Sequence, residues 1–179
     1  MFITLVQRRR SIRKFSDRAV EGEKIDSLIE AALRSPSSMG TNPWKFIVVT
    51  DKALLEKLSA AKPHGAGFLK NAPLGIVVCA DPAKSDVWVE DASIASIFIH
   101  LAAESIGLGS CWIQIRERMH DGSKTAGDYI CEVLGIPGKM KVESMVAIGY
   151  PDERKSPHKK EELEYEKVYL DGYGKPYGS

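Results

Sequence analysis

The chain has 179 residues, of which 44% are hydrophobic and 27% are charged, a balance typical of one soluble globular domain. Lys and Arg number 25 against 24 Asp and Glu, so the net charge of +1 gives no reason to expect nucleic acid or a membrane as partner. Three cysteines without a CxxC spacing exclude a disulfide framework and a thiolate metal site. No signal peptide precedes the first arginines, so a cytoplasmic location is expected.

The hydrophobic pattern, read in chain order, predicts helices that alternate with short strands. Apolar residues at helical spacing predict a helix from Glu23 to Arg34, and Pro36 ends it. The run LGIVVCA predicts a buried strand. In the same way helices are expected at 2–9, 23–34, 52–61, 87–106 and 124–134, and strands at 45–50, 74–80, 110–115 and 142–150. This order predicts an α+β fold.

The predicted helix at 87–106 carries apolar side chains around nearly its whole circumference. A helix that is apolar all round is buried, and Glu90 and Asp91 argue against a membrane span. So short a protein has little material to cover such a helix on every side. Association of two subunits is one way to supply the cover.

Residues 151–179 differ in composition from residues 1–150. They hold six Lys or Arg, seven Asp or Glu, and tyrosines at 165, 169, 173 and 177. Such a segment cannot form a core of its own, and it is either disordered or laid across another surface. The tyrosines favour the second possibility. We therefore expect a body at 1–150 and an extension at 151–179 within one domain.

The sequence RRRSIRKF at residues 8–15 is the strongest local signal for binding. If the segment is helical or turn-like, Arg9 and Arg13 share a face, and Ser11 adds a hydroxyl nearby. Arginine suits an anion with several oxygens, such as a phosphate. The alternative is a solvated basic patch or an arm on nucleic acid, but Ile12 and Phe15 favour a segment with buried anchors.

A second signal is the loop PSSMGTNPW at residues 36–44, which is rich in small polar residues. Such a loop exposes backbone and hydroxyl groups that can bind the edge of a flat ring. On composition alone, an ordinary loop after a helix is the favoured explanation.

Four segments in the same order, RRRSIRKF, PSSMGTNPWKF, GLGSCWIQ and AIGYPDE, resemble the nitroreductase family of flavoproteins over about 150 residues. The resemblance implies a central, mainly antiparallel sheet flanked by helices in an intertwined homodimer, with FMN at each subunit interface. It implies that residues 151–179 wrap the partner subunit.

The family pattern also implies roles for single residues. Arg9 corresponds to the phosphate partner, Ser11 to a ribityl or phosphate contact, and Arg13 to the cation near the flavin N1–O2 edge. Arg10 matches a variable position that also contacts FMN. The loop donated by the other subunit corresponds to Pro36, Ser37, Ser38 and Asn42. The segment beside flavin N5 corresponds to Ile113 and Gln114, and the late basic pair on the phosphate to His158 and Lys160.

The resemblance implies ping-pong hydride transfer from NADH or NADPH, through flavin N5, to a nitroaromatic, a quinone or a similar acceptor. No side chain is expected as an acid or base; Arg13 tunes the flavin. Two other functions stay open: a flavin-binding protein with low turnover, as a store or sensor, and a nucleic-acid-binding protein using residues 8–18. No metal is expected, since His100 and Glu104 lie one helical turn apart without a third ligand and predict a satisfied pair.

Overall fold

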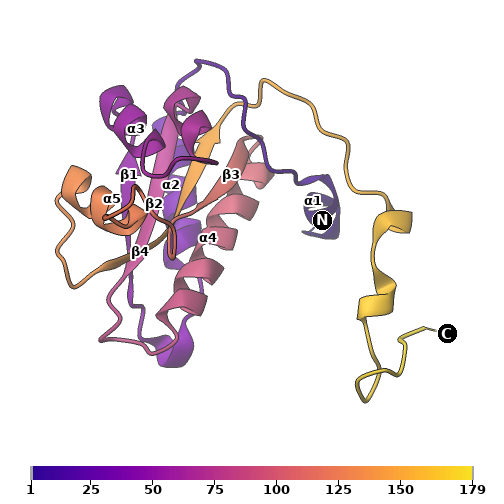
Figure 1. Cartoon of the computed structure of the whole chain (residues 1–179). Coiled ribbons are helices and arrows are strands. Elements are labelled where there is room, and N and C mark those ends of the chain that lie inside the picture. The colour runs from indigo at the N-terminus through magenta and orange to yellow at the C-terminus, as the bar shows by residue number, and fades with distance from the viewer. Residues whose placement is uncertain (1, 179) are drawn as a thin grey trace.

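The computed structural model describes residues 2–178, and it contains one antiparallel sheet flanked by helices (Figure 1). The strand order is β1-β2-β4-β3, from β1 (Trp44–Val49), β2 (Leu74–Ala80), β3 (Gly109–Gln114) and β4 (Lys141–Gly149). The helices are α1 (Phe2–Arg8), α2 (Gly22–Leu33), α3 (Lys52–Ser59), α4 (Trp88–Ser105) and α5 (Ala126–Leu134). Short 3-10 turns are η1 (Ser38–Gly40), η2 (Gly67–Asn71), η3 (Lys160–Glu162) and η4 (Tyr165–Lys167). The predicted α+β class and its antiparallel sheet are confirmed.

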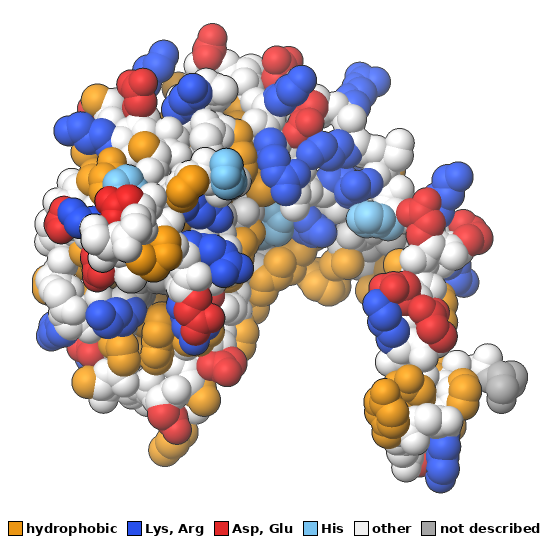
Figure 2. Space-filling model, viewed as in Figure 1, with side chains coloured by type: hydrophobic (Ala, Val, Ile, Leu, Met, Phe, Trp, Pro, Cys, Tyr) orange, Lys and Arg blue, Asp and Glu red, His pale blue; other side chains and the backbone are white. Residues whose placement is uncertain are grey.

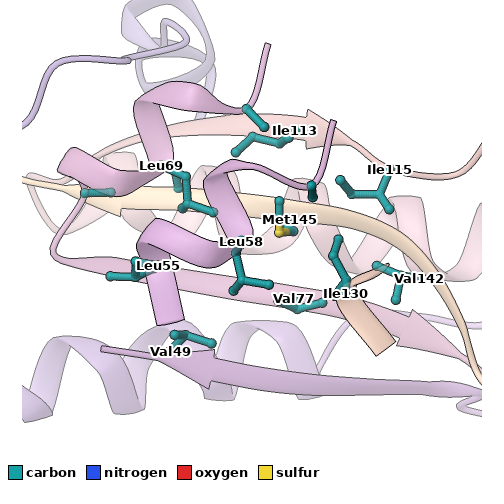
Figure 3. Packing of buried hydrophobic residues seen from close by; sticks show 14 of the residues in the cluster. Val49, Leu55, Leu58, Leu69, Val77, Ile113, Ile115, Ile130, Val142 and Met145 are labelled. Atoms are coloured by element: carbon teal, nitrogen blue, oxygen red, sulfur yellow. The ribbon is translucent and has the colours of Figure 1, made fainter. Parts of the chain in front are cut away.

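The central strands β2 and β4 are mostly apolar, which matches the cover of helices on both faces of the sheet. Every residue of β2 is buried. On one face, α3 and α5 pack Leu58 and Ile130 against Met145, as Figure 3 shows. On the other face, α2 and α4 pack Leu28 and Ile99 against the sheet. The two cores leave β3 at one edge of the sheet and β1 at the other.

Helix α4 is buried on one side and open on the other. Ala95 and Ile99 are fully covered, whereas Ile97 and Phe98 are 41% and 37% exposed. The expectation of burial on every side therefore holds within one chain for only part of the circumference. Within residues 2–178, no helix combines the length and the apolar character that crossing a bilayer requires.

Residues 151–178 leave the end of β4 as an arm whose first residues, up to Ser156, hydrogen-bond to the N-terminal segment and whose remainder stands apart from the body (Figure 1). Nearly all of its residues are exposed, and hydrophobic side chains gather toward its far end in Figure 2. The large exposed hydrophobic residues of the arm are Leu163, Tyr165, Val168, Tyr169, Leu170, Tyr173 and Tyr177. Because the arm builds no core with its own chain, its binding surface stays a prediction.

Candidate functional site

The arginine-rich segment runs along the edge of β3 after α1 ends at Arg8. The backbone N–H of Ile12 donates to the Ser110 carbonyl oxygen at 2.9 Å, and Ser11 forms a parallel bridge with Ser110. The segment is thus strand-like beyond α1, not helical. The N–H of Arg9 still donates to the Leu5 carbonyl oxygen at 3.0 Å, as at a helix end, and the two guanidinium groups contact different elements: that of Arg9 meets His100 of α4, whereas that of Arg13 lies 5.8 Å from the ring centroid of Phe68.

Two apolar anchors fix this segment to the body, as its sequence predicts. Ile12 and Phe15 are 8% and 7% exposed and belong to the core on the α3 and α5 face. The close approach depends on Gly109 at the start of β3, where an added Cβ would lie 2.9 Å from the Cβ of Ile12. The arginines are therefore held by packing as well as by hydrogen bonds.

Gly109→Ala is expected to destabilise the protein by about 1–3 kcal/mol, because the new methyl group overlaps Ile12 and pushes the arginine segment off β3. Urea unfolding measures the loss. Gly22→Ala is the matched control, since its Cβ would enter open space at the start of α2. Equal free energies of unfolding for Gly109→Ala and wild type would show that the close contact is not needed.

Arg9 is bound by a histidine from α4. Its Nη1 lies 3.0 Å from Nε2 of His100, and Nδ1 of the same ring is hydrogen-bonded to the Ser110 hydroxyl. Burial first, and then the charge of Arg9, lower the pKa of His100 to about 4. Glu104 forms its ion pair with Arg8 instead, at 3.7 Å. His100 and Glu104 thus both have partners, although not each other, and the described residues, 2–178, hold no cluster of three potential metal ligands.

Basic side chains from the start of the arm join the arginine segment. The Arg10 guanidinium donates to the Ser156 carbonyl oxygen. Lys155 Nζ donates to the Ser11 carbonyl oxygen at 2.6 Å. A cavity of about 470 Å³ opens here, lined in part by Arg8, Arg10, Arg154 and Lys155. The sequence alone gives no signal for Lys155, because its contact with Ser11 spans 144 positions.

Glu153 clamps the backbone next to Arg13. Its carboxylate accepts from the N–H groups of Arg13 at 2.6 Å and Lys14 at 3.2 Å, and it pairs with Lys155 at 3.2 Å. The hydrogen bond from the Arg13 N–H is the main cause that lowers the pKa of Glu153 from its ordinary 4.5. Because the folded form prefers the carboxylate, this stabilisation is complete above 4.5 and is lost as the pH falls through the lowered pKa.

Glu153→Gln is expected to lower the melting temperature at neutral pH, since the uncharged amide is a weaker acceptor for the two N–H groups. The gap to wild type should narrow progressively as the pH falls below 4.5, where the wild-type carboxyl group also becomes protonated. Thermal unfolding over a pH series tests this. Glu161→Gln, on the exposed arm, is the control. A gap that stays constant with pH would contradict a role for the charge.

The loop predicted to meet a flavin is held by hydrogen bonds, and it lies at the first turns of α4. Met39 and Asn42 have positive φ angles of 50° and 46°. The Ser37 hydroxyl accepts from the Asn42 N–H at 3.0 Å, and Asp91 accepts from the Ser38 N–H at 2.7 Å. Left-handed backbone at a residue such as Met39 costs free energy and persists only where neighbours impose it. Pro36, at the start of the loop, is exposed.

The predicted N5 segment lies on the edge strand β3. Ile113 is buried in the core, while Gln114 is half-buried and accepts a hydrogen bond from Trp112 Nε1 at 3.0 Å. The N–H of the next residue, Ile115, donates to Glu143 of β4 at 3.1 Å. Because N–H directions alternate along a strand, the N–H of Gln114 points away from β4, toward the open edge of the sheet.

The predicted late basic pair lies on the arm. His158 and Lys160 are both exposed, and His158 Nδ1 lies 3.5 Å from a carboxylate oxygen of Glu162. The structure thus brings the predicted residues Arg9, Arg10, Ser11 and Arg13 next to β3. Within one chain, the loop at 36–42 lies apart from them, near the start of α4. Its contact Asp91 precedes His100 by nine positions on α4, or roughly 14 Å of helix. The contacts that the sequence does not predict are those of His100, Ser110, Asp91, Glu153 and Lys155.

Comparison with known proteins identifies the family of this chain. Residues 6–65 and 60–150 match the model of the Nitroreductase family. An FMN-dependent nitroreductase of Clostridium difficile R20291 is 50% identical, with 96% of this chain and 99% of that chain covered and a TM-score of 0.94. A protein of Archaeoglobus fulgidus, provisionally named NADH dehydrogenase/NAD(P)H nitroreductase, is 41% identical over 160 residues, 86% of this chain and 87% of its own. An NAD(P)H-dependent FMN reductase of Bacillus subtilis is 28% identical over 186 residues, 90% of this chain and 71% of its own. Because the family model spans most of the sequence, this chain belongs to the nitroreductase family.

Proposed function

We propose that the protein is an FMN-dependent oxidoreductase that takes electrons from NADH or NADPH and passes them to a nitroaromatic, a quinone or a similar acceptor. The names of its relatives support the cofactor and the donor. When bound, FMN supplies the two-electron chemistry. The observation that carries the proposal is Arg9, a half-buried cation held beside β3 by a neutral histidine.

The N-terminal segment fits the phosphate end of FMN. Arg9 and Arg10 offer guanidinium groups and Ser11 a hydroxyl, which together suit an anion with several oxygens. His158 and Lys160 complete the set if the arm that carries them lies close by in the assembled protein. The buried anchors Ile12 and Phe15 hold this segment against the body, which favours a fixed anion site over a mobile arm on nucleic acid.

The edge of β3 fits the ring end. The backbone N–H of Gln114, next to Ile113, points outward and can hydrogen-bond a ring nitrogen. Arg13 supplies a cation whose charge favours the negative charge that reduction adds to a flavin. Its own backbone is fixed by Glu153, so this cation stays near the site.

A second copy of the chain completes the proposed site. The loop residues Pro36, Ser37, Ser38 and Asn42 lie too far along α4 to share one chain's site with Arg9. In a homodimer, the loop of one subunit covers the ring held by the other. The open side of α4, with Ile97 and Phe98, and the arm at 151–178 provide apolar surface for that contact.

Spectroscopy and rapid mixing test the proposal. The purified protein should carry flavin absorption and should bleach when mixed anaerobically with NADH or NADPH, then regain its colour with a quinone or a nitroaromatic compound. Very slow bleaching with both donors would instead indicate a flavin store or sensor. A colourless monomer that takes up no added FMN would contradict the proposal entirely.

A further inference from the structure

His100 is a buried polar residue that links three elements of the fold near the arginine segment. It lies on α4 and is 7% exposed. Its Nε2 contacts Arg9, just beyond α1, and its Nδ1 contacts Ser110 on β3. A polar ring at so enclosed a position needs both of its nitrogen atoms satisfied, and here both have partners.

The protonation state of the ring follows from these partners. A guanidinium group has no acceptor, so Nε2 of His100 must accept the hydrogen bond from Arg9. The ring is then neutral, carries its proton on Nδ1 and donates it to the Ser110 hydroxyl. That hydroxyl in turn faces the carbonyl oxygen of His100 at 3.5 Å. Ser110 thereby selects the form of the ring that can bind Arg9.

A neutral partner leaves the positive charge of an arginine in place, whereas a carboxylate partner offsets it. Arg8, one residue earlier, forms an ion pair with Glu104 at 3.7 Å, so its partner is negatively charged. Arg9 uses an N–H of its guanidinium on a neutral ring, so its positive charge and its remaining donors stay available. The two neighbouring arginines thus differ in their capacity to bind a further anion.

We infer that His100 is a positioning residue that fixes Arg9 for the phosphate of FMN without neutralising it. The inference rests on the proposed function. It predicts different effects for two substitutions of His100. Glutamate would hold Arg9 firmly but cancel its charge, whereas glutamine would hold Arg9 and leave the charge intact.

The test compares FMN with riboflavin, which lacks the phosphate, by flavin fluorescence titration of wild type, His100→Gln and His100→Glu. We expect His100→Glu to reduce the preference for FMN over riboflavin by about tenfold or more, and His100→Gln to change it by less than about threefold. Riboflavin affinity should change little in both. In an Arg9→Ala background, the two substitutions should have equal effects, because the charge they act on is gone.

The outcomes separate this inference from the proposed function. Equal losses in His100→Gln and His100→Glu would overturn the inference while leaving the flavin site in place. A wild type that binds FMN no better than riboflavin would instead overturn the phosphate role of Arg9 itself.

A second measurement does not depend on the fold of the glutamate variant. In the flavin-free wild type at neutral pH, two-bond ¹H–¹⁵N spectra should show His100 neutral and protonated on Nδ1, with its signals identified by their absence in His100→Gln. Ser110→Ala removes the acceptor for that proton and should weaken the preference for FMN. A ring protonated on Nε2, or an unchanged preference in Ser110→Ala, would overturn the inference.

Discussion

Replacing Arg9 by alanine is expected to weaken FMN binding by about 1.5–3 kcal/mol, a roughly 10- to 150-fold rise in Kd. The substitution removes a charge-assisted donor that is half-buried and anchored on His100, so solvent screens it less than a surface cation. It also leaves His100 without its donor. Fluorescence titration with FMN measures the change, and riboflavin shows whether the loss belongs to the phosphate.

Arg8→Ala is the matched control for Arg9→Ala. It removes the same type of side chain from the preceding position, but Arg8 is largely exposed and lies 3.7 Å from Glu104. We expect FMN affinity to change by less than about threefold, as is usual for exposed ion pairs. Equal effects of the two substitutions would mean that general basic charge binds the cofactor, and an unchanged Kd in Arg9→Ala would reject its phosphate role.

Local sequence patterns were sufficient to predict the elements of the fold. The run in β2 reads as a fully buried strand because helices cover both faces of the sheet. The predicted helix at 124–134 begins later, at Ala126, because the Thr125 side chain accepts from the Asp128 N–H and caps it. Differences of this kind are confined to element ends, where capping decides the boundary.

The contacts within the site were out of reach of the sequence, because they join distant positions. His100 and Glu104 lie one turn apart on α4 and suggest a pair, yet each contacts a different arginine of the N-terminal segment. The packing of the end of α1 beside α4 decides which arginine each residue contacts, and a local sequence pattern does not reveal that packing. Asp91 likewise reaches Ser38 across 53 positions.

A buried carboxylate in β4 is a further feature without a local signal. Glu143 falls at the register shift between Val78 and Cys79 and is 3% exposed, next to the buried Ser144. Burial is the main cause that raises its pKa. A strand pattern with strict alternation assigns each residue to a face, and a bulge breaks that alternation, so the position of this side chain needed the structure.

Removal of residues 161–179 is expected to convert the proposed homodimer into monomers with poor retention of FMN. The cut keeps Glu153, Lys155 and the basic residues at 158–160, so the N-terminal segment remains fixed. It deletes seven large exposed hydrophobic residues of the arm. If burial of each stabilises the dimer by about 1.5–3 kcal/mol, loss of even two raises the dissociation constant roughly hundredfold or more.

Sedimentation velocity and flavin absorption measure the two effects of the truncation on the same samples. The full-length double variant Leu163→Ser/Leu170→Ser is the control for chain length, since it keeps the arm but removes apolar surface; it should shift the equilibrium in the same direction by less. FMN should be lost together with the dimer, because the loop at 36–42 of one subunit then no longer covers the ring held by the other. A truncated protein that sediments as a dimer and stays yellow would show that the dimer assembles without the arm, through surfaces such as the exposed side of α4. The arm would then not be needed to bind the partner subunit.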